Sequence, residues 1–148
     1  MINLTPKKFK AKLSEQSSLV EGPAFNLELS YDGTALGYLA IDGDGYGVIV
    51  KDKKQAASLI ACRSAGIDNM YIKVEGPENT YLTHWDFSTD DLGASEQGQA
   101  VTWKIKKYGN SSQLISTANG QSLGIKTANE TKLNVRDDYL VLDVKINR

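Results

Sequence analysis

The chain of 148 residues has very little of two residue types on which many catalytic and metal sites depend. It contains one cysteine, Cys62, and one histidine, His84. A single cysteine excludes an intramolecular disulfide framework and any zinc site built on cysteines. A single histidine means that every histidine-based acid–base or triad mechanism has to use His84. Both scarcities favour a binding protein over an enzyme.

The chain also lacks long apolar runs and an excess of either charge. Its apolar clusters are of the size of Gly47–Val50, far short of the roughly 18 residues of a membrane-spanning helix. The 17 basic and 18 acidic residues leave a formal net charge of −1, whereas a nucleic-acid-binding domain usually carries a basic stripe. We therefore expect no membrane insertion and no nucleic-acid partner. No apolar signal segment follows Met1, so the expected location is the cytoplasm or, after leaderless secretion, outside the cell.

Residues 1–24 differ from the rest of the chain and are predicted to form an N-terminal arm. They carry four lysines against two glutamates, a net charge of +2, while residues 25–148 carry −3. Thr5 followed by Pro6 is typical of a helix start. The alternation of Phe9 and its apolar neighbours with lysines is instead typical of a strand. Both conformations stay open, and so do three roles: a homodimer contact, a crossover to another subunit and a solvated tail.

From Phe25 onward the pattern indicates an all-β protein. Short apolar-rich runs alternate with clusters of glycine, asparagine, aspartate and proline, as in a barrel or a sandwich. One of these clusters, Asn119-Gly120, is a strong signal for a tight hairpin because it lies between two β-like runs. No run in this part of the chain sustains a helical period beyond about two turns.

An internal repeat is the most informative feature of the sequence. A leucine with β-like neighbours recurs at Leu39, Leu82 and Leu123, at intervals of 43 and 41 residues. Further apolar positions recur in register with these leucines, at Ile49, Leu92 and Leu133 and again at Leu59, Trp103 and Leu140. The spacing predicts three units of four strands each, approximately residues 25–68, 69–111 and 112–148. The repeated apolar residues are expected to form the core, since one unit cannot bury its own apolar face.

Twelve strands in three units of about forty residues resemble the β-trefoil superfamily. The resemblance covers residues 25–148 and depends on the aligned leucines and on Trp103 in the fourth strand of the middle unit. It implies a six-stranded barrel capped by three hairpins, with a sandwich or a lipocalin-like barrel as the alternative. Similarity to trefoil lectins implies sugar binding near the hairpins. The Gln-x-Trp motif of ricin-type lectins is not matched, because Val101 stands two places before Trp103, so no galactose specificity follows.

The loop between the second and third strands of each unit carries residues suited to sugar recognition. Carboxylates and amides hydrogen-bond sugar hydroxyls, and an aromatic ring covers the apolar side of the sugar ring. The predicted ligand-binding residues are Asp42, Asp44, Tyr46, His84, Trp85, Asp86 and Asn129. The alternative is that the aspartates and the asparagine only form turns and that the histidine is a hydrogen-bonded residue at the rim.

Two other sequence features do not have the residues that a binding site of their type needs. A calcium loop starting at Asp42 would need a bidentate glutamate at its twelfth position, where Lys53 stands. The two groups of lysines are interpreted as solvated strand ends rather than a phosphate-binding track; they are Lys51, Lys53 and Lys54, and Lys104, Lys106 and Lys107.

Together these patterns predict a non-enzymatic carbohydrate-binding protein without a metal or another cofactor. Its partners would be glycans or glycoproteins, bound weakly at each hairpin and more strongly through multivalency. The alternative is a protein-binding trefoil, such as a protease inhibitor or a toxin-associated interaction module, which would use one exposed loop.

Overall fold

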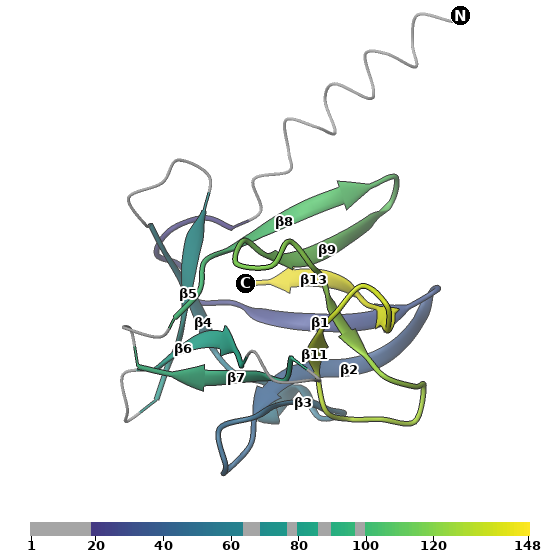
Figure 1. Ribbon diagram of the computed structural model, residues 1–148. Helices are drawn as coiled ribbons and strands as arrows, with labels where there is room; N and C mark the ends of the chain where they lie inside the picture. Colours follow the sequence, from purple (N-terminus) through teal and green to yellow (C-terminus); the bar gives the residue numbers. More distant parts are fainter. Residues whose placement is uncertain (1–18, 64–68, 77–79, 86–89, 97–99) are drawn as a thin grey trace, which may run out of the picture.

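The structure is a computed structural model that describes residues 19–63, 69–76, 80–85, 90–96 and 100–148 (Figure 1). These residues form thirteen strands and one short 3-10 helix, η1 (Lys53–Gln55), and they include no α-helix. The predicted all-β class is therefore confirmed. In the described ranges, no helix has the length and apolar character needed to cross a membrane.

The strand bounds follow the turn signals of the sequence. The strands are β1 (Asn26–Tyr31), β2 (Thr34–Ile41), β3 (Gly47–Val50), β4 (Leu59–Arg63), β5 (Met70–Val74), β6 (Thr80–His84), β7 (Leu92–Ser95), β8 (Trp103–Tyr108), β9 (Ser111–Ser116), β10 (Leu123–Ile125), β11 (Asn134–Val135), β12 (Leu140–Val141) and β13 (Asp143–Asn147). Buried and more exposed residues alternate along β1 and β8, as expected for strands with one face against a core.

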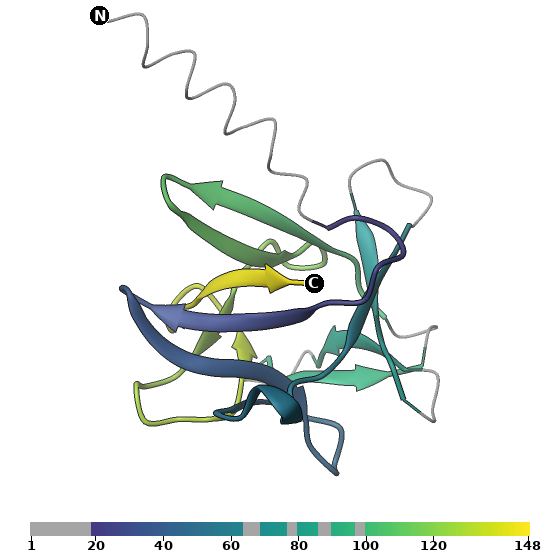
Figure 2. The same cartoon turned by 180° about the vertical axis from the view of Figure 1, so that it is seen from behind.

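The strands pair into three open sheets. One sheet has the order β13-β1-β2-β3, a small one has the order β11-β10-β12, and the third has the order β7-β6-β5-β8-β9 with β4 beside β5. An isolated bridge between Phe25 and Leu59 links the start of β1 to β4. Strand β13 lies beside β9 in both views of the molecule (Figures 1 and 2). The edges of the first and third sheets therefore approach each other.

The repeated apolar positions form the core, as expected. Leu39, Leu82 and Leu123 are completely buried. So are most residues of the two further series, namely Leu92, Leu133, Leu59 and Trp103, while Ile49 and Leu140 pack against the core from half-buried positions. These side chains come from all three sheets, so the sheets share one core.

Residues 19–24, at the end of the predicted arm, contact β4. Leu19 is buried in the core, and Glu21 forms a parallel bridge with Ala61. The carboxylate of Glu21 also accepts the backbone N–H of Arg63 at 3.1 Å and lies 3.5 Å from its guanidinium. This end of the arm is thus part of the folded domain. Residues 1–18, including the segment that fits either a helix or a strand, lie outside the described residues.

Three hairpin segments meet in what we call the hairpin junction, defined as residues 45–49, 91–94 and 131–134. Backbone hydrogen bonds join each segment to the next, with Ala94 N–H donating to Gly45 O at 2.9 Å and Leu133 N–H donating to Gly47 O at 2.9 Å. The isolated bridges at the junction are Tyr46–Gly93, Val48–Lys132 and Asp91–Asn134. Side chains from distant parts of the sequence are thereby brought together.

Candidate functional site

Tyr46 and Trp85, predicted as site residues from separate units, contact each other at the hairpin junction. Their ring centroids are 5.3 Å apart and their planes are inclined by 71°, an edge-to-face arrangement. Tyr46 directly precedes β3 and Trp85 directly follows β6, and both side chains are half-buried. The structure therefore places the two predicted aromatic residues in one cluster, with part of each side chain accessible.

Gly93 in β7 provides the space in which the indole of Trp85 lies. A Cβ atom at this position would overlap the indole ring and lie 2.7 Å from the carbonyl oxygen of Gly45. Only glycine therefore lets the indole approach the backbone of β7 so closely. A glycine inside a strand is a sequence signal for such an approach, and it could have pointed to this contact.

Charged and amide side chains border the aromatic pair. The Nζ of Lys132 lies 4.2 Å from the ring centroid of Tyr46 and 3.8 Å from Oδ2 of Asp91. The Nδ2 of Asn134 donates to Oδ1 of Asp91 at 2.9 Å. We call Tyr46, Trp85, Asp91, Lys132 and Asn134 the aromatic cluster. Lys132 and Asn134 were not among the predicted site residues, because only strand pairing across about forty residues brings them to the cluster. Asp91 belongs to the same hairpin as Trp85, whose backbone N–H donates to Asp91 O at 3.1 Å.

Asp42 shapes the hairpin that carries Tyr46. Its Oδ1 accepts the backbone N–H of Asp44 at 2.9 Å and that of Tyr46 at 3.0 Å. This is the turn-forming role that aspartate often takes. Asp44 is exposed at the tip of the same turn. Asp42 thus acts on the aromatic cluster through the position of Tyr46.

Asn129, predicted from the third unit, is exposed in a turn in which Glu130 N–H donates to Thr127 O at 3.1 Å. In the part of the chain that the structure describes, no hydrogen bond joins Asn129 to the aromatic cluster. The predicted residue Asp86 lies outside the described residues. The third unit therefore contributes Lys132 and Asn134 to the cluster instead.

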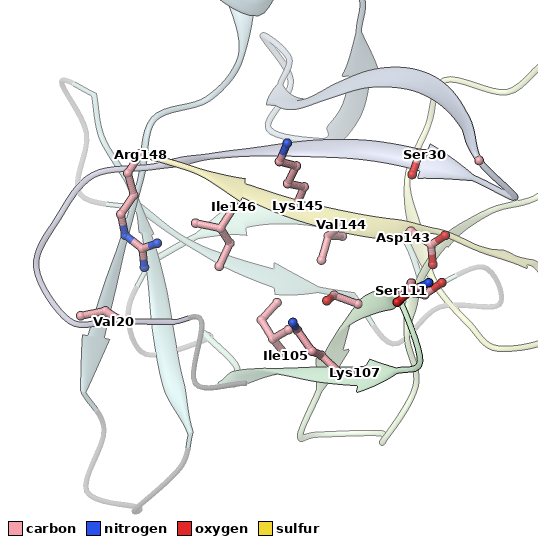
Figure 3. A pocket seen from close by; sticks show the side chains of 13 residues that line it. Val20, Ser30, Ile105, Lys107, Ser111, Asp143, Val144, Lys145, Ile146 and Arg148 are labelled. Atoms are coloured by element: carbon pink, nitrogen blue, oxygen red, sulfur yellow. The ribbon is translucent and has the colours of Figure 1, made fainter. Parts of the chain in front are cut away.

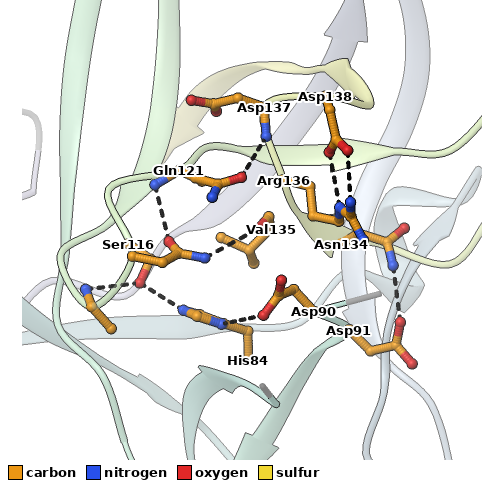
Figure 4. Close-up of polar contacts among 12 residues, drawn as sticks. His84, Asp90, Asp91, Ser116, Gln121, Asn134, Val135, Arg136, Asp137 and Asp138 are labelled. Atoms are coloured by element: carbon orange, nitrogen blue, oxygen red, sulfur yellow. Dashed lines mark hydrogen bonds and ion pairs between the residues drawn. The ribbon is translucent and has the colours of Figure 1, made fainter. Parts of the chain in front are cut away.

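His84 lies between Ser116 and Asp90 (Figure 4). Its side chain is only 6% exposed. The Nε2 atom lies 2.8 Å from Oγ of Ser116, and the ring packs edge-on against Trp103 with centroids 6.0 Å apart. Successive residues of an extended chain point to opposite faces, which explains why His84 is buried while its neighbour reaches Tyr46. The structure thus shows a hydrogen-bonded histidine at the end of β6 whose side chain is largely covered, and a ligand contact of His84 stays a prediction.

Asp90, His84 and Ser116 have the residue types of a hydrolytic triad, but their geometry does not present a nucleophile. Ser116 is completely buried, and its Oγ also accepts the backbone N–H of Ala118 at 3.1 Å. The Nδ1 of His84 is 3.6 Å from Oδ1 of Asp90, longer than a hydrogen bond. A nucleophilic serine has to reach its substrate. The three residues therefore connect the β6–β7 segment to the turn after β9.

Replacing His84 is expected to destabilise the fold. His84→Leu removes a polar partner of the buried Ser116 hydroxyl, which costs about 1–3 kcal/mol when the group is left unsatisfied. His84→Gln keeps an amide near the position of Nε2 and is expected to lose less. Urea unfolding followed by circular dichroism measures both variants. A leucine variant as stable as the glutamine variant would contradict the structural role of this contact.

The polar network continues toward β11 and the turn after it (Figure 4). Gln121 Oε1 accepts the backbone N–H of Asp137 at 3.0 Å, and Asp137 Oδ1 accepts that of Ser122 at 2.7 Å. The guanidinium of Arg136 donates to both carboxylate oxygens of Asp138, at 2.8 and 2.6 Å. These hydrogen bonds lower the pKa of Asp138 and raise the pKa of Arg136. The side chains are thus held by contacts within the protein.

Two further findings bear on the chemistry of the site. Within the described residues, no three histidine, cysteine, aspartate or glutamate side chains gather as they would around a metal ion. No protein-family model matches the chain, and no curated protein matches its sequence. The function therefore has to be inferred from the residues and contacts described above.

Proposed function

We propose that this protein is a β-trefoil that binds carbohydrates without catalysing a reaction, through the aromatic cluster at the hairpin junction. The observation that carries the proposal is the contact between Tyr46 and Trp85, with Lys132 reaching both the ring of Tyr46 and the carboxylate of Asp91. An aromatic side chain offers an apolar surface to the C–H face of a sugar ring. The carboxylate and the ammonium group of Lys132 can hydrogen-bond the hydroxyls of that ring.

Three observations support the trefoil arrangement. Leucines at equivalent positions of the three units are buried in one core. The three hairpin segments bridge one another at the hairpin junction. The strands that would form a barrel pair as β1 with β13, β4 with β5, and β8 with β9. These pairs would be joined at the neighbouring sheet edges, where β13 lies beside β9.

The aromatic cluster is organised before any ligand arrives. The Asp42 turn holds Tyr46, Gly93 leaves room for Trp85, and the amide of Asn134 orients Asp91. Such order lowers the entropic cost of binding. The site is shallow, because its aromatic residues are half-buried on the surface of the junction. We therefore expect weak affinity for one sugar, raised when glycans or glycoproteins engage several copies.

Trp85→Ala is expected to reduce glycan affinity about tenfold or more, because aromatic anchors dominate such binding energies. A glycan array identifies the ligand, and fluorescence titration then measures its affinity. Trp103 is completely buried, so a ligand-induced change in tryptophan emission reports on Trp85. The intensity change is expected in the wild type and is expected to be lost in the variant.

Tyr31→Ala is a matched control for the removal of an aromatic side chain. Tyr31 is 39% exposed and lies at the end of β1, outside the aromatic cluster. This variant is expected to keep the affinity of the wild type. The proposal is wrong if no glycan binds, or if both aromatic variants bind as well as the wild type. Inhibition of a protease without glycan binding would instead support the protein-binding alternative.

A further inference from the structure

The β8–β9 hairpin concentrates positive charge without an acidic partner on either strand. Residues 103–116 contain three lysines and no aspartate or glutamate. Lys104 and Lys106 are exposed, and neither forms an ion pair with any residue that the structure describes. Residues two apart on a strand point to the same face. Their two ammonium groups therefore repel each other.

Lys104, Lys106 and Tyr108 stand on one face of the hairpin, beside a cavity of about 380 Å³. Tyr108 is 49% exposed, and the Nζ of Lys106 lies 5.2 Å from its ring centroid. The hairpin register places Ile115 opposite Lys104 and Gln113 opposite Lys106. The cavity therefore combines two cations, an open aromatic ring, an amide and an apolar wall, and its volume is in the range of small-ligand sites.

Three more residues that line this cavity influence which ligands it attracts. Asn69 and Thr117 add an amide and a hydroxyl to the lining. Asp137 is the acidic residue of the lining, and its carboxylate already accepts the backbone N–H of Ser122. The lysines thus exceed the acidic groups, so the cavity is expected to attract anions.

We infer that this cavity is a binding site for an acidic sugar, a hexuronate or a sulfated hexose. The two ammonium groups pair with the carboxylate or sulfate, since charge-assisted hydrogen bonds are stronger than neutral ones. The exposed ring of Tyr108 lies against the C–H face of the sugar. The amides of Asn69 and Gln113 bond its hydroxyls. This site is distinct from the aromatic cluster and does not depend on the function proposed for it.

The opposite face of the same hairpin provides an internal comparison (Figure 3). Lys107 points with Ile105 into a larger groove of about 710 Å³, which β13 also lines. None of the described residues that line this groove is aromatic. It therefore offers positive charge without the flat surface that a sugar ring needs. Lys107→Gln removes one lysine charge from the same hairpin, as Lys104→Gln does, and serves as the control for that single substitution.

Titration of the full-length protein, followed by backbone amide NMR, tests the site with four probes. They are glucuronic acid, a sulfated glucose, glucose and inorganic phosphate. At least one acidic sugar is expected to shift the amides of residues 104–108 and 113–117. Its affinity is expected to exceed those of glucose and phosphate about tenfold and to fall as salt is added. The stronger of the two acidic sugars identifies the preferred anionic group.

Substitutions then distinguish binding in this cavity from unspecific attraction of the anionic sugar to any lysine of the hairpin. The double variant Lys104→Gln, Lys106→Gln is expected to weaken binding of the acidic sugar about tenfold, and Lys104→Gln alone and Tyr108→Ala are expected to weaken it as well. Lys107→Gln is expected to stay within about twofold of the wild type, since Lys107 points into the groove on the opposite face of the hairpin and makes no direct contact with the bound anion. Equal affinity for glucose or phosphate would overturn the inference. So would an equal loss of affinity in the Lys107 variant, or shifts confined to other strands.

Discussion

Trp103→Ala is expected to lower the free energy of unfolding by about 3–5 kcal/mol. Trp103 is the largest completely buried side chain, and its indole N–H donates to the carbonyl oxygen of Leu82 at 3.2 Å. Its removal leaves a cavity against the ring of His84 and takes away the hydrogen bond to the Leu82 carbonyl oxygen. Because small domains are stabilised by only about 5–15 kcal/mol in total, this loss is large. Urea unfolding followed by circular dichroism measures it.

Trp103→Phe is the control for this substitution. It keeps an aromatic ring in the core but removes the hydrogen bond to Leu82, so it is expected to lose less stability than the alanine variant. If the alanine variant had the same unfolding midpoint as the wild type, the prediction that the packing of Trp103 stabilises the core would be wrong.

Gly93→Ala is expected to destabilise the protein by about 1–3 kcal/mol and to displace the indole of Trp85. The added methyl group would overlap that indole and approach the carbonyl oxygen of Gly45. Gly93 is not among the glycines with a left-handed backbone, so the cost comes from lost space and not from backbone strain. We expect a shift in tryptophan emission and a loss of glycan affinity, together with the lower stability.

Gly43→Ala provides the matched control in the neighbouring turn. A Cβ atom at Gly43 would meet no atom within 4 Å, so its stability is expected to stay within about 0.5 kcal/mol of the wild type. Unchanged emission and unchanged stability of the Gly93 variant would contradict the packing of Trp85 against β7. If the Gly93 variant showed shifted tryptophan emission but bound glycan with the affinity of the wild type, the result would contradict a role of the Trp85 indole in binding.

Two aspects of the protein could be predicted from its sequence. The all-β class followed from short apolar runs and turn-forming residues, which act over a few neighbouring positions. The buried leucines at positions 39, 82 and 123 followed from periodicity, because an apolar position that recurs in each unit has to be covered by the others. Tyr46 and Trp85 were selected by residue type and by their place in equivalent loops of two units, without any indication that they would touch.

Tertiary structure decided which side chains meet. Strand register brought Lys132 to the ring of Tyr46 and Asn134 to Asp91, and register across distant hairpins leaves no local pattern in a sequence. It also gave His84 its hydrogen-bond partner Ser116, which lies 32 residues further along the chain. The sequence alone thus determined the all-β class and the repeated apolar positions of the core, while the predicted twelve strands became thirteen in the structure. The contacts that could give these residues a function depend on how segments about forty residues apart pair with one another.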